Sequence, residues 1–414
     1  MAVEQFGIAD SFNATNTNLI VALTPCEIMR KSILLAAICS LMIVYGCDPA
    51  TSPNAEKPVY LNDGIAVGTL DEVGMKKEVI KEVVDSINSG YYPNRHSLLI
   101  YKDDKLVFEV YFTGRDYCWG RDLGIVSHSD TVLHDMRSVS KSIVSACIGI
   151  AIEQGKIEGA DQKVFDFFKD YNQYNIGGKG ELTIRHLLTM TSGLEWDETV
   201  PADNTEAQME ASEDIVGFIL SRNLVSAPGT VWNYNGGTTE LLANIILRTT
   251  GKNVYAFAKE YLFEPMGITH SQWTNYYGKN NPAAASGLRL SSRDMLKFGI
   301  LYQNKGKWGS TQIVPMNWVM DSFAPGISLP AAENTPNGAY GYQFWIYNDS
   351  IQSKPVTVQA AVGNGDQRIY IDQNNKLIIV TTAGIYNMWD IQNNAKAIHR
   401  KLYDSFSVNQ NDLL

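Results

Sequence analysis

Ser138 and Lys141 stand three residues apart at the start of an apolar run, residues 142–150, which we interpret as a buried helix. Residues at positions i and i+3 share one face of a helix, so the hydroxyl and the amine can point into one cavity. The helix N-terminus adds a partial positive charge and free N–H groups that favour an oxyanion. Burial lowers the pKa of a lysine, so we expect Lys141 to accept the proton of Ser138. The spacing predicts a nucleophile with its base.

The alternative is a solvated helix turn, because Ser-x-x-Lys arises by chance in many chains. Two features favour the chemical interpretation. Residues 133–137 read as a strand that leads into the motif, and the segment after it is too apolar for a surface helix. A lysine that enters such a helix needs a partner, since lysine is almost never buried unpaired.

Tyr234 lies in a glycine-containing segment, residues 231–237, that precedes a predicted helix over residues 239–250. A phenol held close to a nucleophile can relay a proton if a nearby cation lowers its pKa. The alternative is a core tyrosine with a hydrogen-bonded hydroxyl. The chain has 21 tyrosines, so the residues alone favour this alternative.

A second glycine-containing segment leads into a predicted strand over residues 367–371; it comprises Gly363, Asn364, Gly365, Asp366 and Gln367. Glycines at such a place let a substrate approach the backbone, and let N–H groups point at a developing oxyanion. An ordinary Gly-Asn turn explains the same residues equally well.

The order of these three motifs resembles the serine β-lactamase and penicillin-binding-protein superfamily, most closely its class C-like branch. That branch holds AmpC-type β-lactamases, D-alanyl-D-alanine carboxypeptidases, certain esterases and the 6-aminohexanoate-dimer hydrolases. Residues 183–194 (TIRHLLTMTSGL), 263–268 and 286–295 are similar to further signatures of the branch, and residues 136–142 most resemble the 6-aminohexanoate-hydrolase-like subgroup. The resemblance extends over roughly residues 90–405.

The resemblance implies a role for each motif. Ser138 is the expected nucleophile, Lys141 the base and Tyr234 the proton relay. The oxyanion hole is expected from the backbone N–H of Ser138 and one N–H of residues 365–367. Water activated by the Tyr234/Lys141 pair then hydrolyses the acyl-enzyme, and no cofactor is needed.

Two departures from the family pattern narrow the expected substrate. The second motif is often Tyr-x-Asn, but here Asn235 is followed by Gly236. The third motif is Lys-Thr-Gly or His-Thr-Gly in lactamases and peptidases, whereas residues 363–365 carry no charge that could attract a carboxylate. We therefore expect a serine hydrolase for an uncharged ester or amide. A D-alanyl-D-alanine carboxypeptidase or weak β-lactamase is the enzymatic alternative, and a non-catalytic cell-envelope binding lipoprotein is the other.

For several further side chains near these motifs, the sequence does not decide between a place in the site and a structural role. Arg368 alternates on its predicted strand, and we expect it on a solvated face. Four aromatic residues suit either the lining of an acyl or aryl cleft or the core: Trp196, Trp232, Tyr342 and Trp345.

The elements that must position these residues indicate an α+β fold of the β-lactamase/transpeptidase type. Predicted strands lie at residues 97–101 and 106–112, then at 340–346, 367–371 and 376–382. Predicted helices lie between them and at both ends, at residues 71–88, 138–150, 164–174, 183–190, 214–221, 239–250, 291–304 and 391–403. An antiparallel sheet built from the N- and C-terminal segments, flanked by helices, follows from this order. The helical lobe is inserted at about residues 155–300, and the site is expected at the seam.

The first part of the chain has the pattern of an export signal. Residues 29–46 combine a charged start with an apolar run, and Cys47 follows in a lipobox-like Val-Tyr-Gly-Cys. We expect residues 1–28 to be untranslated or unstructured, 47–65 to form a tether and 66–410 to form the hydrolase domain. This predicts a bacterial lipoprotein of the cell envelope that touches the membrane only through its lipid. An uncleaved membrane anchor is the alternative.

Composition excludes several kinds of partner. The net charge of −10 argues against nucleic acid and anionic surfaces. The six histidines are scattered in the sequence and no Cys/His spacing suits a metal, so we expect no metal site. We expect Cys147 to be a small core residue rather than half of a disulfide with Cys118. The predicted partner is a small ester, amide or peptide, and the oligomeric state is open.

Overall fold

The computed structural model describes residues 57–198, 204–330, 338–388, 390–391 and 394–408. The predicted export signal and Cys47 lie outside these residues. The chain joins the domain slightly before the expected boundary at residue 66, because Ile65 is buried and Arg293 binds both Asp63 and the carbonyl oxygen of Val59. Among the described residues, no helix is long and apolar enough to cross a membrane.

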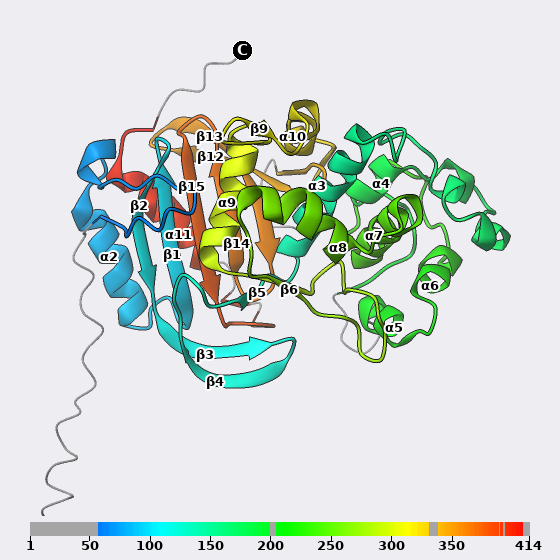
Figure 1. The fold of residues 1–414 in the computed structure, drawn as a ribbon, viewed down its shortest axis with the longest axis horizontal. Coiled ribbons are helices and arrows are strands. Elements are labelled where there is room, and N and C mark those ends of the chain that lie inside the picture. The colour runs from blue at the N-terminus through cyan, green and yellow to red at the C-terminus, as the bar shows by residue number, and fades with distance from the viewer. Residues whose placement is uncertain (1–56, 199–203, 331–337, 389, 392–393, 409–414) are drawn as a thin grey trace, which may run out of the picture. The chain divides into compact units, whose positions relative to one another are not determined.

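An eight-stranded antiparallel sheet forms the centre of the domain, with strand order β10-β11-β12-β13-β14-β15-β1-β2 (Figure 1). Two strands come from the N-terminal segment, β1 (Arg95–Lys102) and β2 (Lys105–Tyr111). The other six come from the C-terminal segment: β10 (Ile327–Ser328), β11 (Ala339–Tyr340), β12 (Trp345–Ile351), β13 (Lys354–Gly363), β14 (Gln367–Asp372) and β15 (Leu377–Ala383). Strand β1 pairs with β15, with Leu99 opposite Val380. The sheet therefore joins the two ends of the domain, and the predicted α+β fold is confirmed.

Helices cover both faces of the sheet, which explains why its central strands are apolar on both sides. Leu99 faces one core together with residues of α9 (Ser292–Gln303), such as Met295, and with α3 (Val139–Glu153). Its neighbours Leu98 and Ile100 face a second core, formed with α2 (Lys77–Asn88) and α11 (Asn394–Leu402). Adjacent residues of a strand point to opposite faces, so the strand serves both cores.

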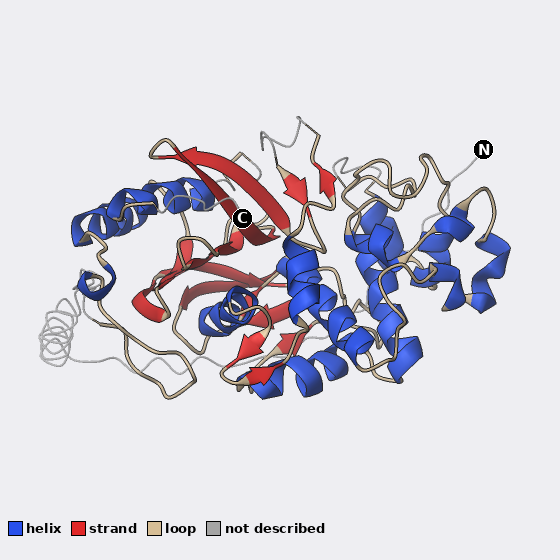
Figure 2. Ribbon diagram, turned by 90° about the horizontal axis from the view of Figure 1, so that it is seen from above, coloured by secondary structure: helices blue, strands red, loops and turns tan. Residues whose placement is uncertain are grey.

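The middle of the chain forms a helical lobe that lies beside α3 (Figure 1). Its helices gather on one side of the domain, on the right of Figure 2. Its α-helices are α4 (Ile184–Leu188), α5 (Thr205–Ala211), α6 (Ile215–Ser221), α7 (Gly236–Thr250) and α8 (Val254–Ala258). Short 3-10 helices span Val164–Asp166, Lys169–Tyr174, Lys179–Glu181 and Glu264–Met266, and a π-helix spans Lys259–Phe263. The long helix α7 packs against α3, α4 and α6, so it links the lobe to the helix that carries Ser138.

Small elements complete the fold. The hairpin β3 (Thr113–Cys118) and β4 (Arg121–Ser127) was not among the predicted strands. A three-stranded sheet has the order β5 (His134–Asp135), β7 (Leu288–Leu290), β6 (Gln272–Trp273). A two-stranded one joins β8 (Lys307–Trp308) to β9 (Thr311–Gln312), and the helix α10 (Met316–Phe323) follows. The expected strand over 133–137 is thus reduced to β5.

Two predicted elements are interrupted for local reasons. The strand expected over residues 340–346 is split into β11 and β12, because Gln343 has φ +63° and donates its backbone and side-chain N–H groups to α4 carbonyls. The helix expected over residues 71–88 begins only at Lys77, since Gly74 at φ +67° ends a short 3-10 helix, Asp71–Val73. Both cysteines within the described residues are free, and Cys147 is buried as expected.

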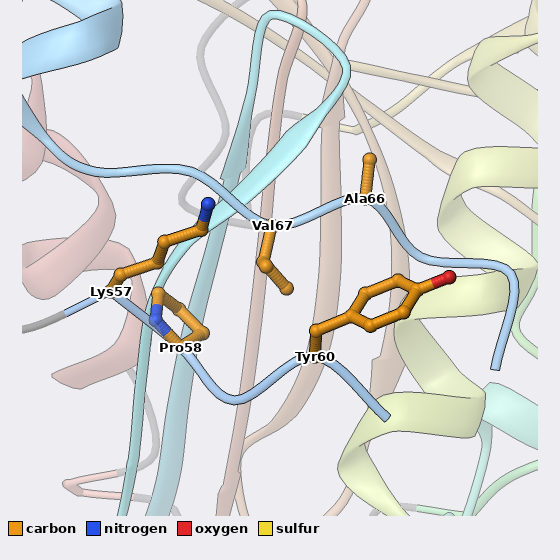
Figure 3. Close-up of a pocket in the computed structure, with 5 residues that line it drawn as sticks. All are labelled: Lys57, Pro58, Tyr60, Ala66 and Val67. Carbon is orange, nitrogen blue, oxygen red and sulfur yellow. The ribbon is translucent and has the colours of Figure 1, made fainter. Parts of the chain in front are cut away.

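An open hollow of about 500 Å³ lies on the segment that precedes α2 (Figure 3). It is lined by Lys57, Pro58, Tyr60, Ala66 and Val67. Val67 pairs with Leu106 of β2, the edge strand of the sheet. Ser138 caps helix α3, which contacts β13 and β14. Strands β15 and β1 therefore lie between the strands beneath Ser138 and the edge strand β2 beside the hollow.

Candidate active site

Ser138 occupies the N-cap position of α3, and Lys141 lies one turn further along the helix. Lys141 Nζ donates a hydrogen bond to Ser138 Oγ over 3.0 Å, so the spacing brings the two side chains together as predicted. The turn before Ser138 is tight: Arg137 has φ +48°, a sparsely populated region for a residue with a side chain. The Ser140 hydroxyl closes this turn by donating to the Arg137 carbonyl oxygen. Ser138 itself is half-buried and reachable from solvent.

The environment of Lys141 favours its charged form. The side chain is buried, and Nζ also donates to the carbonyl oxygen of Ala285 over 3.0 Å. Burial alone acts to lower the pKa of Lys141, but Tyr234, Glu198 and Glu206 face the amine, and together they raise this pKa above its ordinary value. The expected lowering of the lysine pKa is therefore wrong, because residues remote in the sequence supply compensating negative charge.

Tyr234 completes the group that the sequence predicted. Its hydroxyl interacts with the side chains of Ser138 and Lys141, and Lys141 Nζ lies 5.0 Å from the centre of the phenol ring. Burial raises the pKa of Tyr234, while the lysine ammonium opposes this rise. The loop is held by Asn235, whose side-chain oxygen caps α7 by accepting from the Thr238 N–H over 3.2 Å.

Glu198 is a site residue that the sequence prediction missed. Its Oε1 accepts the backbone N–H of Gly236 over 2.6 Å and the indole N–H of Trp196 over 2.7 Å. Burial and the neighbouring Glu206 raise its pKa to about 7, although Lys141 acts in the opposite sense. The carboxylate thus lies beside Gly236, where family members often carry the asparagine of Tyr-x-Asn. A lone glutamate in a loop gives no sequence signal for this role.

Glu240 is the second site residue that the sequence did not indicate, and it binds the backbone of Ala285. Its Oε1 accepts from the hydroxyl of Tyr276 over 2.6 Å and from the N–H of Ala285 over 2.9 Å. The carbonyl oxygen of the same Ala285 accepts a hydrogen bond from Lys141 Nζ. Burial raises the pKa of Glu240 to about 7. Glu240 therefore fixes the segment that holds the amine in place.

Only part of the predicted oxyanion segment lies against the nucleophile. The Cα of Gly363 packs on the turn before Ser138, where a Cβ would meet the Met136 carbonyl oxygen and the Arg137 side chain. Asn364 pairs with Asn387 instead, and Gly365 packs against the ring of Tyr386.

The last two residues of the segment use their side chains for structure. Asp366 forms a buried ion pair with Arg95, with Nη2 and Oδ2 2.7 Å apart. Gln367 forms two hydrogen bonds with the backbone of Ala383. The backbone of residues 363–365 is therefore the part of the segment that lies beside the turn before Ser138. The side chains of Asp366 and Gln367 lie outside the site.

Arg368 is buried, contrary to the expected solvated face. Its Nη2 lies 2.9 Å from Asp366 Oδ1, and its Nη1 donates to the carbonyl oxygen of Gly363 over 2.8 Å. Strand β14 is an interior strand that contacts both α9 and α11, so neither of its faces is solvated. Arg368 therefore stabilises residues 363–366 through its contacts with the Gly363 carbonyl oxygen and the Asp366 carboxylate.

Aromatic side chains form one wall beside Tyr234. The ring of Trp345 stacks on that of Tyr234 with 5.9 Å between centroids, and Trp232 lies 5.7 Å from Trp345. The other two aromatics that the sequence singled out belong to the packing. Tyr342 lies 5.0 Å from Trp318, and Trp196 packs in the main core while binding Glu198.

The histidines are not scattered in space. His96, His128 and His134 form one cluster with Asp116, which overturns the expectation that histidine positions exclude a metal site. Three of these residues come from β1, β3 and β5, and His128 directly follows β4, so only the folded chain brings them together.

The arrangement at Ser138 can carry out acyl transfer. It provides a hydroxyl nucleophile at a helix N-terminus, an ammonium that donates to that hydroxyl, a phenol beside the ammonium, and a backbone segment against the nucleophile turn.

Comparisons with known proteins identify the family and the fold. An uncharacterized protein of Alkalihalophilus pseudofirmus is 24% identical over 301 residues, which cover 67% of this chain and 76% of that protein. The 6-aminohexanoate-dimer hydrolase of Paenarthrobacter ureafaciens is 20% identical over 264 residues, covering 60% of this chain and 65% of that enzyme. Among solved structures, EstCE1, described as a hydrolase with promiscuous acyltransferase activity, superposes with a TM-score of 0.62 at 14% identity, covering 79% of this chain and 98% of that one. The Beta-lactamase family is matched over residues 95–398, and the chain belongs to that family.

Proposed function

We propose that this protein is a serine hydrolase that cleaves an ester or amide through an acyl-enzyme on Ser138. The observation that carries the proposal is the hydrogen bond of 3.0 Å from Lys141 Nζ to Ser138 Oγ, with the centre of the Tyr234 ring 5.0 Å from the same Nζ. A half-buried hydroxyl that accepts from an amine, with a phenol ring beside that amine, suits nucleophilic catalysis. The hydrolase names of the relatives support the same reaction class.

The pKa directions suggest how the Lys141/Tyr234 pair acts. The pKa values of Lys141 and Tyr234 are both raised, so the pair holds both protons near neutral pH and the reactive state is the one that has lost one of them. In our proposal that state is the phenolate of Tyr234 beside the ammonium of Lys141, because each charge stabilises the other. In that state Tyr234 accepts the Ser138 proton while Oγ bonds to the substrate carbonyl carbon. The proton is then returned to the leaving alcohol or amine as the carbonyl–heteroatom bond breaks.

The second half of the reaction repeats these steps with water. The Tyr234/Lys141 pair takes a proton from a water molecule, and the resulting hydroxide attacks the acyl carbon. The proton then returns to Ser138 Oγ, and the carboxylic acid leaves. The backbone N–H of Ser138 and one from residues 363–365 are the proposed donors to the oxyanion in both halves.

An uncharged substrate fits the segment beside the nucleophile best. Residues 363–365 carry no cation, and Arg368 behind them is paired with Asp366. The aromatic wall of Trp232 and Trp345 suits an apolar acyl or alcohol group. Hydrolysis of p-nitrophenyl acetate and butyrate by the full chain in mild detergent tests the proposal, with Ser138→Ala as the matched variant. A stable penicillin adduct on Ser138 with no ester turnover would favour the peptidase alternative instead.

We also propose that the chain is exported and lipid-modified at Cys47, in line with the signal pattern of residues 29–47. Partitioning of the wild-type protein into a detergent phase, compared with Cys47→Ser, tests this. Equal partitioning of both proteins into the aqueous phase would contradict it.

A further inference from the structure

A buried polar cluster lies beneath the β3–β4 hairpin, apart from the groups that act on Ser138. His96 on β1, Asp116 on β3 and His134 on β5 are almost completely buried. His128 follows β4, and its side chain is 4% exposed. Three imidazoles around one carboxylate in a buried space need an explanation, because each must find a hydrogen-bond or ligand partner.

The hydrogen bonds around the cluster fix the tautomer of His96 and leave two arrangements for His134. Asn94 donates its Nδ2 to the Arg115 carbonyl and accepts the Arg115 N–H at Oδ1, so its orientation is fixed. His96 Nε2, 3.3 Å from that Oδ1, must then carry the proton, which leaves His96 Nδ1 bare. This Nδ1 lies 2.9 Å from His134 Nε2. In one arrangement His134 Nδ1 donates to the Asp135 carbonyl 3.2 Å away, which leaves Nε2 bare and free to bind an ion. In the other, Nδ1 accepts from the Tyr386 hydroxyl 3.3 Å away, and Nε2 donates to His96 Nδ1.

Two further atoms of the cluster have no hydrogen-bond partner among the described residues. They are Asp116 Oδ2 and His128 Nε2, both buried, which lie 3.9 Å apart. This separation is too wide for a direct hydrogen bond. The other oxygen, Asp116 Oδ1, accepts the Tyr117 N–H and lies 3.4 Å from His134 Nε2.

We propose that His96, Asp116 and His128 bind a divalent transition-metal ion of the Zn²⁺ class, with His134 as a fourth donor. One ligand atom from each of the first three residues lies within 4.8 Å of the others. Donors about 2.0–2.1 Å from a tetrahedral zinc ion are roughly 3.4 Å apart, so shifts of about 1 Å close the site. The His128 ring, which stacks on His96 at 3.9 Å, turns toward the carboxylate to do so.

The donor set and its surroundings match the chemistry of such an ion. Imidazole and carboxylate suit zinc and its neighbours in the first transition row. Asn94 and the Asp135 carbonyl stand at the far nitrogens of His96 and His134, where metal-bound histidines commonly find a hydrogen-bond partner. A cation also provides a partner for Asp116 Oδ2 and His128 Nε2, which have none among the described residues.

The site would fix the strand that delivers the nucleophile. Strand β5 contains His134 and ends at Asp135, three residues before Ser138. The Tyr386 hydroxyl lies 3.3 Å from His134 Nδ1, and the ring of Tyr386 packs on Gly365. A bound ion would therefore tie the hairpin, β5 and the 363–365 segment together, in a structural role that does not depend on the proposed hydrolase activity.

Metal uptake by the full chain in mild detergent tests the proposal directly. The protein is stripped with a chelator and titrated with Co²⁺, and the visible d–d absorption of four-coordinate Co²⁺ is followed. Displacement by Zn²⁺ and elemental analysis then give the stoichiometry. We expect one ion per chain, a rise in Tm with Zn²⁺, and binding weakened by more than about 100-fold in Asp116→Asn and His128→Asn.

His270→Asn is the matched control, because His270 is exposed and outside the cluster. Unchanged uptake in this variant together with loss in the other two supports the site. The proposal is overturned if the wild-type chain shows neither Co²⁺ absorption nor a Zn²⁺-dependent Tm, or if Asp116→Asn and His128→Asn bind as tightly as wild type. If one variant fails to fold, the wild-type measurements and the other variant still show whether the chain binds a metal ion at this cluster.

Discussion

Gly363 packs directly on the carbonyl oxygen of Met136, so the last residue of β13 touches the turn that presents Ser138. A Cβ at position 363 would lie under 3.0 Å from that oxygen, closer than real Cβ atoms come. The contact couples the central sheet to the nucleophile, and it requires a residue without a side chain.

Gly363→Ala should therefore displace the Arg137 turn and lower ester turnover by more than about 100-fold, the order of loss expected when reacting groups shift by about 1 Å. Gly159→Ala is the control, because a Cβ there meets nothing within 4 Å. The measurement is kcat/KM for p-nitrophenyl acetate. Equal activity of the two variants would show that the Gly363 contact does not position the nucleophile.

The charge of Glu198 should set the pH at which the Lys141/Tyr234 pair loses its proton. Glu198 raises the pKa of both Lys141 and Tyr234. Activity should rise with pH as the pair is deprotonated, and Glu198→Gln should move this rise to lower pH, because the negative charge is removed. The pH profile of kcat/KM measures the shift. Glu195→Gln, an exposed carboxyl three residues away, should leave the profile in place. A shift to higher pH in Glu198→Gln would contradict the assignment.

Glu240 should make the domain less stable as the pH rises. Its pKa of about 7 in the folded protein exceeds the ordinary value of 4.5, so the folded state holds this proton more tightly than the unfolded state. The resulting stabilisation is complete below about pH 4.5 and is lost as the pH rises through about 7. Relative to Glu240→Gln, the wild-type free energy of unfolding should fall by about 3 kcal/mol across this window. Urea unfolding at several pH values measures it, with the exposed Glu158→Gln as control. Parallel pH dependences for wild type and Glu240→Gln would refute the prediction.

The buried ion pairs of Asp366 with Arg95 and Arg368 should raise the free energy of unfolding. Arg95 and Arg368 both pair with this carboxylate, and the backbone N–H of Ala395 donates to it over 2.8 Å. Asp366→Asn removes the counter-charge of two buried guanidinium groups and should cost about 3–5 kcal/mol of unfolding free energy. The exposed pair of Asp122 with Arg115 provides the comparison, since Asp122→Asn should cost less than about 1 kcal/mol. Equal losses in the two variants would contradict the importance of burial.

The fold could be predicted from the sequence where the signal is local. The hairpin of β14 and β15 and the helix that begins at Ser138 follow from apolar periodicity and turn residues. A single sheet that joins the N- and C-terminal strands follows from the order of elements, because strands at both ends of a domain need partners. The Ser138–Lys141 contact follows from helix geometry alone.

What depends on tertiary neighbours could not be predicted. The pKa direction of Lys141 is decided by Tyr234, Glu198 and Glu206, which lie 57–93 positions away in the sequence. The burial of Arg368 follows from helices on both faces of β14, while the alternation of its strand suggested one solvated face. The histidine cluster draws on separate strands, so no spacing in the sequence reveals it.

Covalent labelling of Ser138 is the most direct test of the central claim. The full chain in mild detergent is treated with a fluorophosphonate, and intact-protein and peptide mass spectrometry locate the adduct in wild type, Ser138→Ala and Lys141→Ala. The account predicts one adduct on Ser138 in wild type, none in Ser138→Ala, and labelling slowed by at least about 10³-fold in Lys141→Ala. A folded wild-type protein that is not labelled, or one labelled equally in Ser138→Ala, would contradict it.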